Sequence, residues 1–263
     1  MKSWKVIDEQ VMTPCMKFIP LRASDRRIGS ALIFASVFSV ALLVVRMFLT
    51  QKPVYSFLIW NLFLAWIPLV CAWLVSHTQK PPSAWKTMWI AIFLWLLFFP
   101  NSPYILTDLG HLARIDVWST LPLGFDVVML LAFTLNGLLL GFVSLFIIER
   151  VWRQHFTSRV ATTLSLVSLF LAGFGIYLGR FLRWNSWDLF HTPLVLVNDL
   201  VVRIINPLSH GMTWGFTALY SSFLIAIYIA VRFWRSAPVE PVVELKTVAK
   251  SKAKKSGKRK KKL

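Results

Sequence analysis

Long apolar segments recur along this chain of 263 residues, and they constrain its fold more than any other feature. A helix needs about 20 mainly apolar residues to cross the roughly 30 Å hydrocarbon core of a bilayer. Six segments meet this requirement: residues 29–49, 54–76, 87–107, 126–148, 160–179 and 212–233. The sequence therefore predicts an all-α fold, a polytopic integral membrane bundle of about six transmembrane helices.

The composition excludes a chain made of one or two ordinary soluble domains. Hydrophobic residues make up 57% of the chain and charged residues only 15%, against about 25% charged residues in a soluble domain. The two cysteines, Cys15 and Cys71, have no spacing that suggests a disulfide framework or a metal knuckle. The first 28 residues lack the apolar core of a cleaved signal peptide, so we expect the first span to act as an uncleaved insertion signal.

The basic residues predict how the helices are oriented. With the N-terminus in the cytoplasm, 23 of the 29 Lys and Arg residues fall on the cytoplasmic side and 6 on the outer side. Multi-pass membrane proteins carry such an excess in their cytoplasmic loops. We therefore expect both termini in the cytoplasm, with a basic N-terminal segment over residues 1–28, a transmembrane domain over 29–233 and a disordered tail over 234–263.

The C-terminal tail carries nine Lys or Arg residues between Lys250 and Lys262. The residues between them are Ser, Ala and Gly, which cannot form a core, so the composition predicts disorder. Anionic lipids of the inner leaflet would attract this segment by about 1 kcal/mol for each basic residue near the surface. The tail has no aromatic side chain to stack on bases, so we expect no specific recognition of nucleic acid.

The third apolar segment is interrupted by Pro-Asn-Ser-Pro at residues 100–103. Two prolines three residues apart remove backbone donors and obstruct the helical hydrogen bonds. A helix over residues 87–99 covers about 20 Å, which places the break in the outer half of the membrane. Freed carbonyls need partners there. The break is either a kink that neighbouring helices satisfy, or a broken helix that forms the floor of an outward-facing site with Asn101 and Tyr104.

Small residues and amides in the spans predict close helix packing. Gly137 and Gly141 form one GxxxG motif and Gly175 and Gly179 form another, at different depths, so the two motifs need not contact each other. Asn61 in the second span is interpreted as an interhelical hydrogen-bonding residue. Ionisable residues are missing from the middle of every predicted span, which argues against an ion-coupled transporter.

The segment from Pro193 to Asn206 is too apolar for an ordinary loop and too short to span a bilayer. It fits either a short helix in the outer membrane interface or a re-entrant segment. Counting it as a span would place the basic tail outside, which the distribution of basic residues opposes.

An Asp-Leu-x-His pattern occurs twice on the predicted outer side. On a helix, the carboxylate and the imidazole of each pair share a face. Each Asp could fix the tautomer of its His for acid–base chemistry, and two such pairs could together hold a divalent metal. The other interpretation is that these groups are solvated helix caps. The candidate catalytic residues are Asp108, His111, Asp188 and His191.

Two arginines, Arg180 and Arg183, follow one turn apart at the end of the fifth span. They could bind an anionic phosphate or carboxylate, or they could simply extend toward the interface. Asp126, which opens the fourth span, is interpreted as a helix cap. The candidate substrate-binding residues are Asn101, Tyr104, Arg180, Arg183, Trp184 and Asn185.

Two of these polar stretches also carry a family resemblance. Residues 100–111 read Pro-Asn-x-Pro-Tyr-Ile-x-Thr-Asp-Leu-x-His, and residues 179–188 read Gly-Arg-Phe-x-Arg-Trp-Asn-Ser-Trp-Asp. Together they resemble the prokaryotic multi-pass membrane family catalogued as domain of unknown function 1361, over about residues 50–235. The resemblance implies a protein of the prokaryotic plasma (inner) membrane. It implies no activity, because none is established for the family.

Three functions are compatible with this pattern. The first is a membrane-embedded enzyme that acts at the outer leaflet on a lipid or lipid-linked anionic substrate. The second is a non-catalytic scaffold or assembly factor, and the third is a small permease component with the broken third span along its path. Clustering of polar groups on the outer side favours the enzyme over the permease, while the lack of a recognised catalytic signature keeps the scaffold equally open.

Overall fold

The computed structural model describes residues 21–77, 85–117 and 122–236, and every regular element within them is a helix. The predicted N-terminal segment up to residue 20 and the polybasic tail lie outside the described residues. Six helical stretches are long and apolar enough to cross a membrane: Arg27–Thr50, Phe57–Ser76, Met88–Ala113, Leu123–His155, Ser158–Leu182 and Leu208–Trp234. The predicted all-α bundle with about six membrane helices is therefore confirmed.

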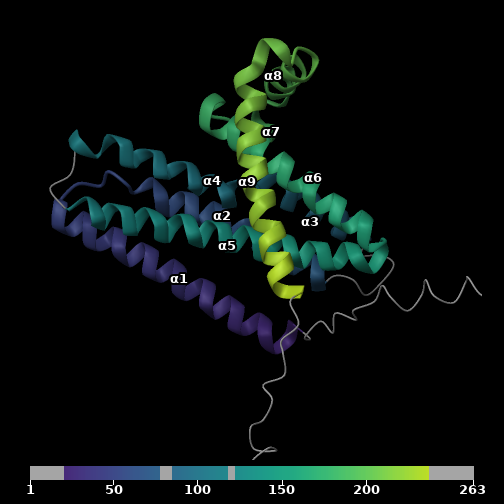
Figure 1. Cartoon of the computed structure of the whole chain (residues 1–263), viewed down its shortest axis with the longest axis horizontal. Helices are drawn as coiled ribbons and strands as arrows, with labels where there is room; N and C mark the ends of the chain where they lie inside the picture. The colour runs from purple at the N-terminus through teal and green to yellow at the C-terminus, as the bar shows by residue number, and fades with distance from the viewer. Residues whose placement is uncertain (1–20, 78–84, 118–121, 237–263) are drawn as a thin grey trace, which may run out of the picture. The chain divides into compact units, whose positions relative to one another are not determined.

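The chain divides into two compact units, residues 1–229 and 230–263, and all contacts described below lie in the first. At its centre α2 (Phe57–His77) packs against α5 (Leu123–His155). The later part of helix α1 (Leu21–Thr50) packs on α5, and the two helices diverge toward the start of α1 (Figure 1). Helix α3 (Trp85–Phe98) packs on α2. Helix α6 (Ser158–Tyr177) packs on α5 as well.

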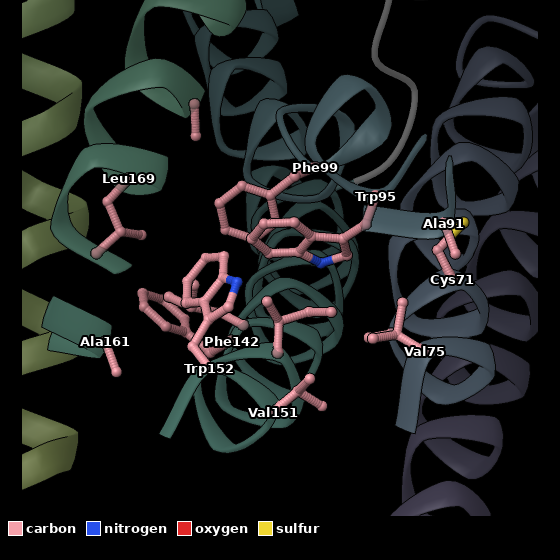
Figure 2. Packing of buried hydrophobic residues seen from close by; sticks show 14 of the residues in the cluster. Cys71, Val75, Ala91, Trp95, Phe99, Phe142, Val151, Trp152, Ala161 and Leu169 are labelled. Carbon is pink, nitrogen blue, oxygen red and sulfur yellow. The ribbon is translucent and has the colours of Figure 1, made fainter. Parts of the chain in front are cut away.

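Aromatic side chains fill the core between these helices. Trp95 is fully buried, and its ring stacks on Phe99 at a centroid distance of 4.8 Å (Figure 2). Trp152 meets the same indole edge-on at 5.8 Å. The indole Nε1 of Trp95 donates to the Ser144 hydroxyl at 3.1 Å, so burial leaves this polar group satisfied.

The third span is broken where the two prolines predict. Helix α3 ends at Phe98, a single turn α4 covers Asn101–Tyr104, and a 3₁₀ helix, η2, covers Ile105–Val117. Side chains satisfy two of the carbonyls at the break. The Phe98 carbonyl accepts from Asn101 Nδ2 at 3.0 Å, and the Leu97 carbonyl accepts from Ser186 Oγ at 3.0 Å. One carbonyl at the break is thus satisfied by the asparagine of the break itself, and the other by a serine that follows the fifth span.

Both glycine motifs pack on the break rather than on each other. A Cβ added at Gly137 of α5 would lie 2.6 Å from the carbonyl oxygen of Ser102. A Cβ added at Gly175 of α6 would lie 2.6 Å from Cγ of Pro100. The absence of side chains on these faces lets α5 and α6 approach α4 from two sides.

The interpretation of Asp126 as a helix cap is wrong. Asp126 and Arg46 are 0% and 1% exposed and form a two-bond ion pair, with 2.6 Å from Arg46 Nε to Oδ1 and 3.2 Å from Nη2 to Oδ2. The guanidinium carbon also lies 4.3 Å from the ring centroid of Tyr55. The pair forms because the end of α1 lies beside the start of α5, a proximity that the two separate segments of sequence do not reveal.

A short helix is present in the apolar segment before the last span. Helix α8 covers Pro193–Ile205, and α9 covers Gly211–Ser236. The apolar side chains of α8 are largely exposed, with Leu194 at 83% and Ile205 at 68%. Its position in the membrane interface, or as a re-entrant segment, stays a prediction.

Candidate functional site

A cavity of about 480 Å³ lies beside the break in the third span. Side chains of α2, α3, α6 and α8 form its walls, together with the loop that follows a π-helical turn, η3 (Leu178–Leu182). Two of the predicted binding residues, Arg180 and Arg183, are not among the described residues that line it. The other four do line it: Asn101, Tyr104, Trp184 and Asn185.

Direct contacts join the two sequence motifs at this cavity. Asn101 Nδ2 donates to Ser186 Oγ at 3.0 Å, in addition to its bond to the helix end. Gly179 packs so closely on Tyr104 that an added Cβ would lie 3.1 Å from its ring carbon Cε2. The two stretches of polar sequence are therefore one structural unit, assembled from the third and fifth spans.

Arg183 shapes the loop that carries the second motif. Its backbone is left-handed, with φ of 60°, and it ends the π-helical turn. The following amide, Trp184 N–H, donates back to the Leu178 carbonyl at 3.1 Å. This reversal places Trp184 and Asn185 at the cavity, whereas the Arg183 side chain is exposed.

Helix α8 is bonded to the same loop. Trp184 Nε1 donates to Asp199 Oδ2 at 3.0 Å, and Arg203 Nη1 donates to the Asp199 carbonyl at 2.7 Å. Leu196 and Leu200, on the face of α8 nearest this contact, line the cavity. The short apolar helix is therefore a wall of the site.

The first Asp-x-x-His pair lies behind the wall of the cavity. Asp108 is 1% exposed and accepts a hydrogen bond from Asn61 Nδ2 at 2.9 Å. Arg180 Nη1 lies 3.6 Å and His111 Nε2 3.9 Å from Asp108 Oδ1. His111 also packs against the Phe57 ring at 5.1 Å. Asn61 belongs both to this cluster and to the cavity lining, so it connects the two.

The second Asp-x-x-His pair has a different environment. Asp188 Oδ2 accepts from the backbone N–H of Asn185 at 2.7 Å and from Asn185 Nδ2 at 3.3 Å, which closes the loop. His191 is exposed at the end of the one-turn helix α7 (Asp188–His191). Within the described residues, no group of three or more His, Cys, Asp and Glu side chains comes together as a possible metal site. The two pairs therefore do not meet.

The sequence predicts binding residues at the break in the third span and in the loop after the fifth span. It does not identify two further residues of the cavity, Asn61 and Ser186. The sequence predicts an interhelical role for Asn61, and the bond to Asp108 agrees with that role, yet Asn61 also lines the cavity. Ser186 lies inside the second motif, and its role becomes visible only when the Leu97 carbonyl is placed beside it.

Replacing Asp108 by Ala is expected to lower the free energy of unfolding by about 1–3 kcal/mol, because Asn61 and Arg180 lose a buried acceptor. The matched variant His191→Ala removes an exposed side chain and should stay within about 0.5 kcal/mol of the parent. Denaturation of both purified variants in detergent measures the difference. An unchanged stability of Asp108→Ala would contradict this structural role of the carboxylate.

Comparison with known proteins identifies a family for this chain, but no relative from which an activity could be inferred. No curated protein and no solved structure matches the chain. A family model does match, over residues 60–227, which is more than half of the chain and includes both motifs. The resemblance carried by the two motifs is thereby confirmed, and the chain belongs to the family described as "Protein of unknown function (DUF1361)".

Proposed function

We propose that this protein binds a lipid or lipid-linked molecule in the cavity beside the broken third span. The observation that carries the proposal is the composition of the cavity wall, which is mainly apolar and contains a few amide and hydroxyl groups. Asn101, Asn185 and Tyr104 lie at the break and the loop, and leucines from α3, α6 and α8 form much of the remaining wall. Ligand sites commonly combine such a wall with a small number of polar groups.

The rim of the cavity supports entry from the bilayer. Trp60 of α2 and Phe93 of α3 line the cavity, yet they are 54% and 52% exposed. Both helices are candidate membrane spans, and exposed apolar side chains on such helices face lipid. A molecule with an acyl or prenyl chain can therefore reach the cavity sideways from the bilayer, past these two aromatic side chains.

The proposed location of this cavity is the outer side of a prokaryotic plasma membrane, and the distribution of basic residues supports the side. The break lies in the outer half of its span when both termini are cytoplasmic, as the count of 23 inside against 6 outside supports. In this orientation the segment from Lys250 to Lys262 faces anionic lipids of the inner leaflet.

The proposal assigns binding rather than a reaction. None of the four candidate catalytic residues is among the described residues that line the cavity. The Asp188 carboxylate already accepts a hydrogen bond from the backbone N–H of Asn185 in its own loop. The scaffold hypothesis differs in one respect, because it needs no ligand in the cavity. A direct test of occupancy therefore separates the two.

Leu200→Trp is expected to reduce lipid occupancy of the cavity several-fold, because Leu200 lines it and an indole fills part of the space. The matched control is Val197→Trp, which adds the same bulk to α8 at a residue that is 47% exposed and outside the lining. Membranes with the full-length protein are irradiated with a lipid that carries a diazirine on its acyl chain. Labelled peptides should include residues of α2 and α3 near Trp60 and Phe93.

Labelling that is equal in both tryptophan variants, and spread evenly over the exposed faces of the helices, would contradict the proposal and favour the scaffold. Thermal denaturation of the two variants in detergent shows whether either substitution disturbs the fold.

A further inference from the structure

Hydrogen bonds inside the protein determine which end of each asparagine amide remains for a ligand. The carbonyls of peptide groups can only accept, so the group that contacts them must be an amino group. Asn101 Nδ2 donates to the Phe98 carbonyl and to Ser186 Oγ, both at 3.0 Å. Ser186 in turn uses its own hydrogen on the Leu97 carbonyl. Both N–H groups of Asn101 are therefore used, and its Oδ1 remains.

The other two asparagines of the cavity are oriented in the same way by carboxylates. Asn61 Nδ2 donates to Asp108 at 2.9 Å, and Asn185 Nδ2 donates to Asp188 at 3.3 Å. A carboxylate accepts and does not donate when ionised, so the amino end of each amide faces it. Within the described residues, no hydrogen bond reaches Oδ1 of any of the three cavity asparagines. None of these three oxygens is a buried atom without a partner, so each is accessible.

The remaining polar groups of the cavity are neutral. Trp184 Nε1 is already used on Asp199. Tyr104 contributes a hydroxyl, which can donate or accept, and Trp60 contributes an indole N–H at the exposed rim. No Lys, Arg, His, Asp or Glu is among the described residues that line the cavity. The side chains that line the cavity therefore offer three amide oxygens, the hydroxyls of Tyr104 and Ser186 and the Trp60 indole N–H, without any formal charge.

We propose that the cavity selects a lipid with a neutral, hydroxyl-rich head group, such as a sugar or glycerol. Hydroxyl groups donate to the three Oδ1 atoms and accept from the indole and the phenol, so both kinds of partner are satisfied. A phosphate or carboxylate would meet carbonyl oxygens with no cation to offset the repulsion and desolvation. This inference rests on the proposed lipid-binding function and replaces the anionic substrate suggested by Arg180 and Arg183.

The arginines agree with this assignment. Arg180 Nη1 lies 3.6 Å from buried Asp108, which offsets its charge within the protein. Arg183 is exposed and ends the π-helical turn through its backbone. The position of each arginine is therefore explained without an anionic ligand in the cavity.

The test compares two lipids with identical chains on the full-length protein in detergent micelles, with native mass spectrometry as the readout. One lipid is dioleoylglycerol with a glucose head group, and the other is dioleoyl phosphatidic acid. We expect the dissociation constant of the glucosyl lipid to be at least about tenfold lower, as expected for the loss of one to two satisfied hydrogen bonds.

Asn185→Ala should raise the dissociation constant of the glucosyl lipid about 3- to 10-fold, because one carbonyl acceptor is lost. The backbone N–H of residue 185 still reaches Asp188, so the loop stays closed. Asn198→Ala is the matched control, because Asn198 is an exposed asparagine of α8 outside the lining. Its affinity for both lipids should equal that of the parent.

The outcomes separate the inference from the function on which it rests. Phosphatidic acid that binds as tightly as the glucosyl lipid, and is displaced in Leu200→Trp, would overturn the inference while keeping a lipid site in this cavity. Binding of both lipids that is indifferent to Leu200→Trp would contradict the proposed function itself. A preference for the glucosyl lipid that survives Asn185→Ala unchanged would exclude the role given to the amide carbonyl.

Discussion

Replacing Asp126 by Leu is expected to lower the free energy of unfolding by about 3–5 kcal/mol, the cost of leaving one buried charge without its partner. Arg46 is 1% exposed, and its Nη1 has no hydrogen-bond partner within the described residues even in the intact pair. Loss of the carboxylate leaves the guanidinium, among the described residues, with the Tyr55 ring and no hydrogen-bond acceptor. Reversible denaturation of the purified variant in detergent measures this effect.

The double variant Arg46→Met/Asp126→Leu provides the control. Replacing both members of a buried ion pair with apolar residues of similar size is often neutral or stabilising. We therefore expect the double variant to recover most of the stability that Asp126→Leu loses. A double variant that is as unstable as the single one would show that the site depends on Arg46 for more than this pair.

Gly175→Ala is expected to destabilise the protein by about 1–3 kcal/mol, because the added methyl group overpacks a site with no space for it. Its Cβ would lie 2.6 Å and 2.7 Å from two ring carbons of Pro100, and a proline ring cannot rotate away. The cavity beside the break should widen or collapse as α6 shifts, so lipid labelling is expected to change together with stability.

Gly215→Ala is the matched control and should have the opposite sign. Gly215 lies within α9, is exposed and has no heavy atom within 4 Å of a built Cβ. Alanine in a helix interior is favoured over glycine by about 0.5–1 kcal/mol. Equal stability changes in the two variants would show that the contact between α6 and Pro100 does not limit helix packing.

The sequence alone predicts the helices and part of the site. Apolar length determines the spans, and the two prolines determine the break, because both signals are local. Asn101 lies at the break in the outer half of the third predicted span, and Trp184 follows the outer end of the fifth, so the predicted orientation puts both on one side of the membrane; both line the cavity. The side of the membrane is thus enough to predict which polar groups share a region, though not which of them make contact.

Contacts between distant segments could not be predicted. Arg46 and Asp126 are separated by 80 positions and carry no local pattern that links them. The repeated Asp-x-x-His pattern allows the hypothesis that the two pairs form one site, yet Asp108 is buried among helices whereas Asp188 closes a loop. The two Asp residues of the repeated pattern have different roles because the residues around each of them come from other parts of the chain.

The hydrogen bond between Ser186 and the Leu97 carbonyl also has a consequence for the order in which contacts form during synthesis. The two residues are 89 positions apart, and ribosomal elongation at about 5–20 residues per second separates their synthesis by roughly 4 to 18 seconds. Asn101 can satisfy the Phe98 carbonyl at once, but the Leu97 carbonyl has no side-chain partner until the fifth helix and its loop emerge. During that interval the Leu97 carbonyl lacks the hydroxyl from which it accepts in the folded chain. The hydrogen bond between the third helix and the loop after the fifth can therefore form only late in synthesis.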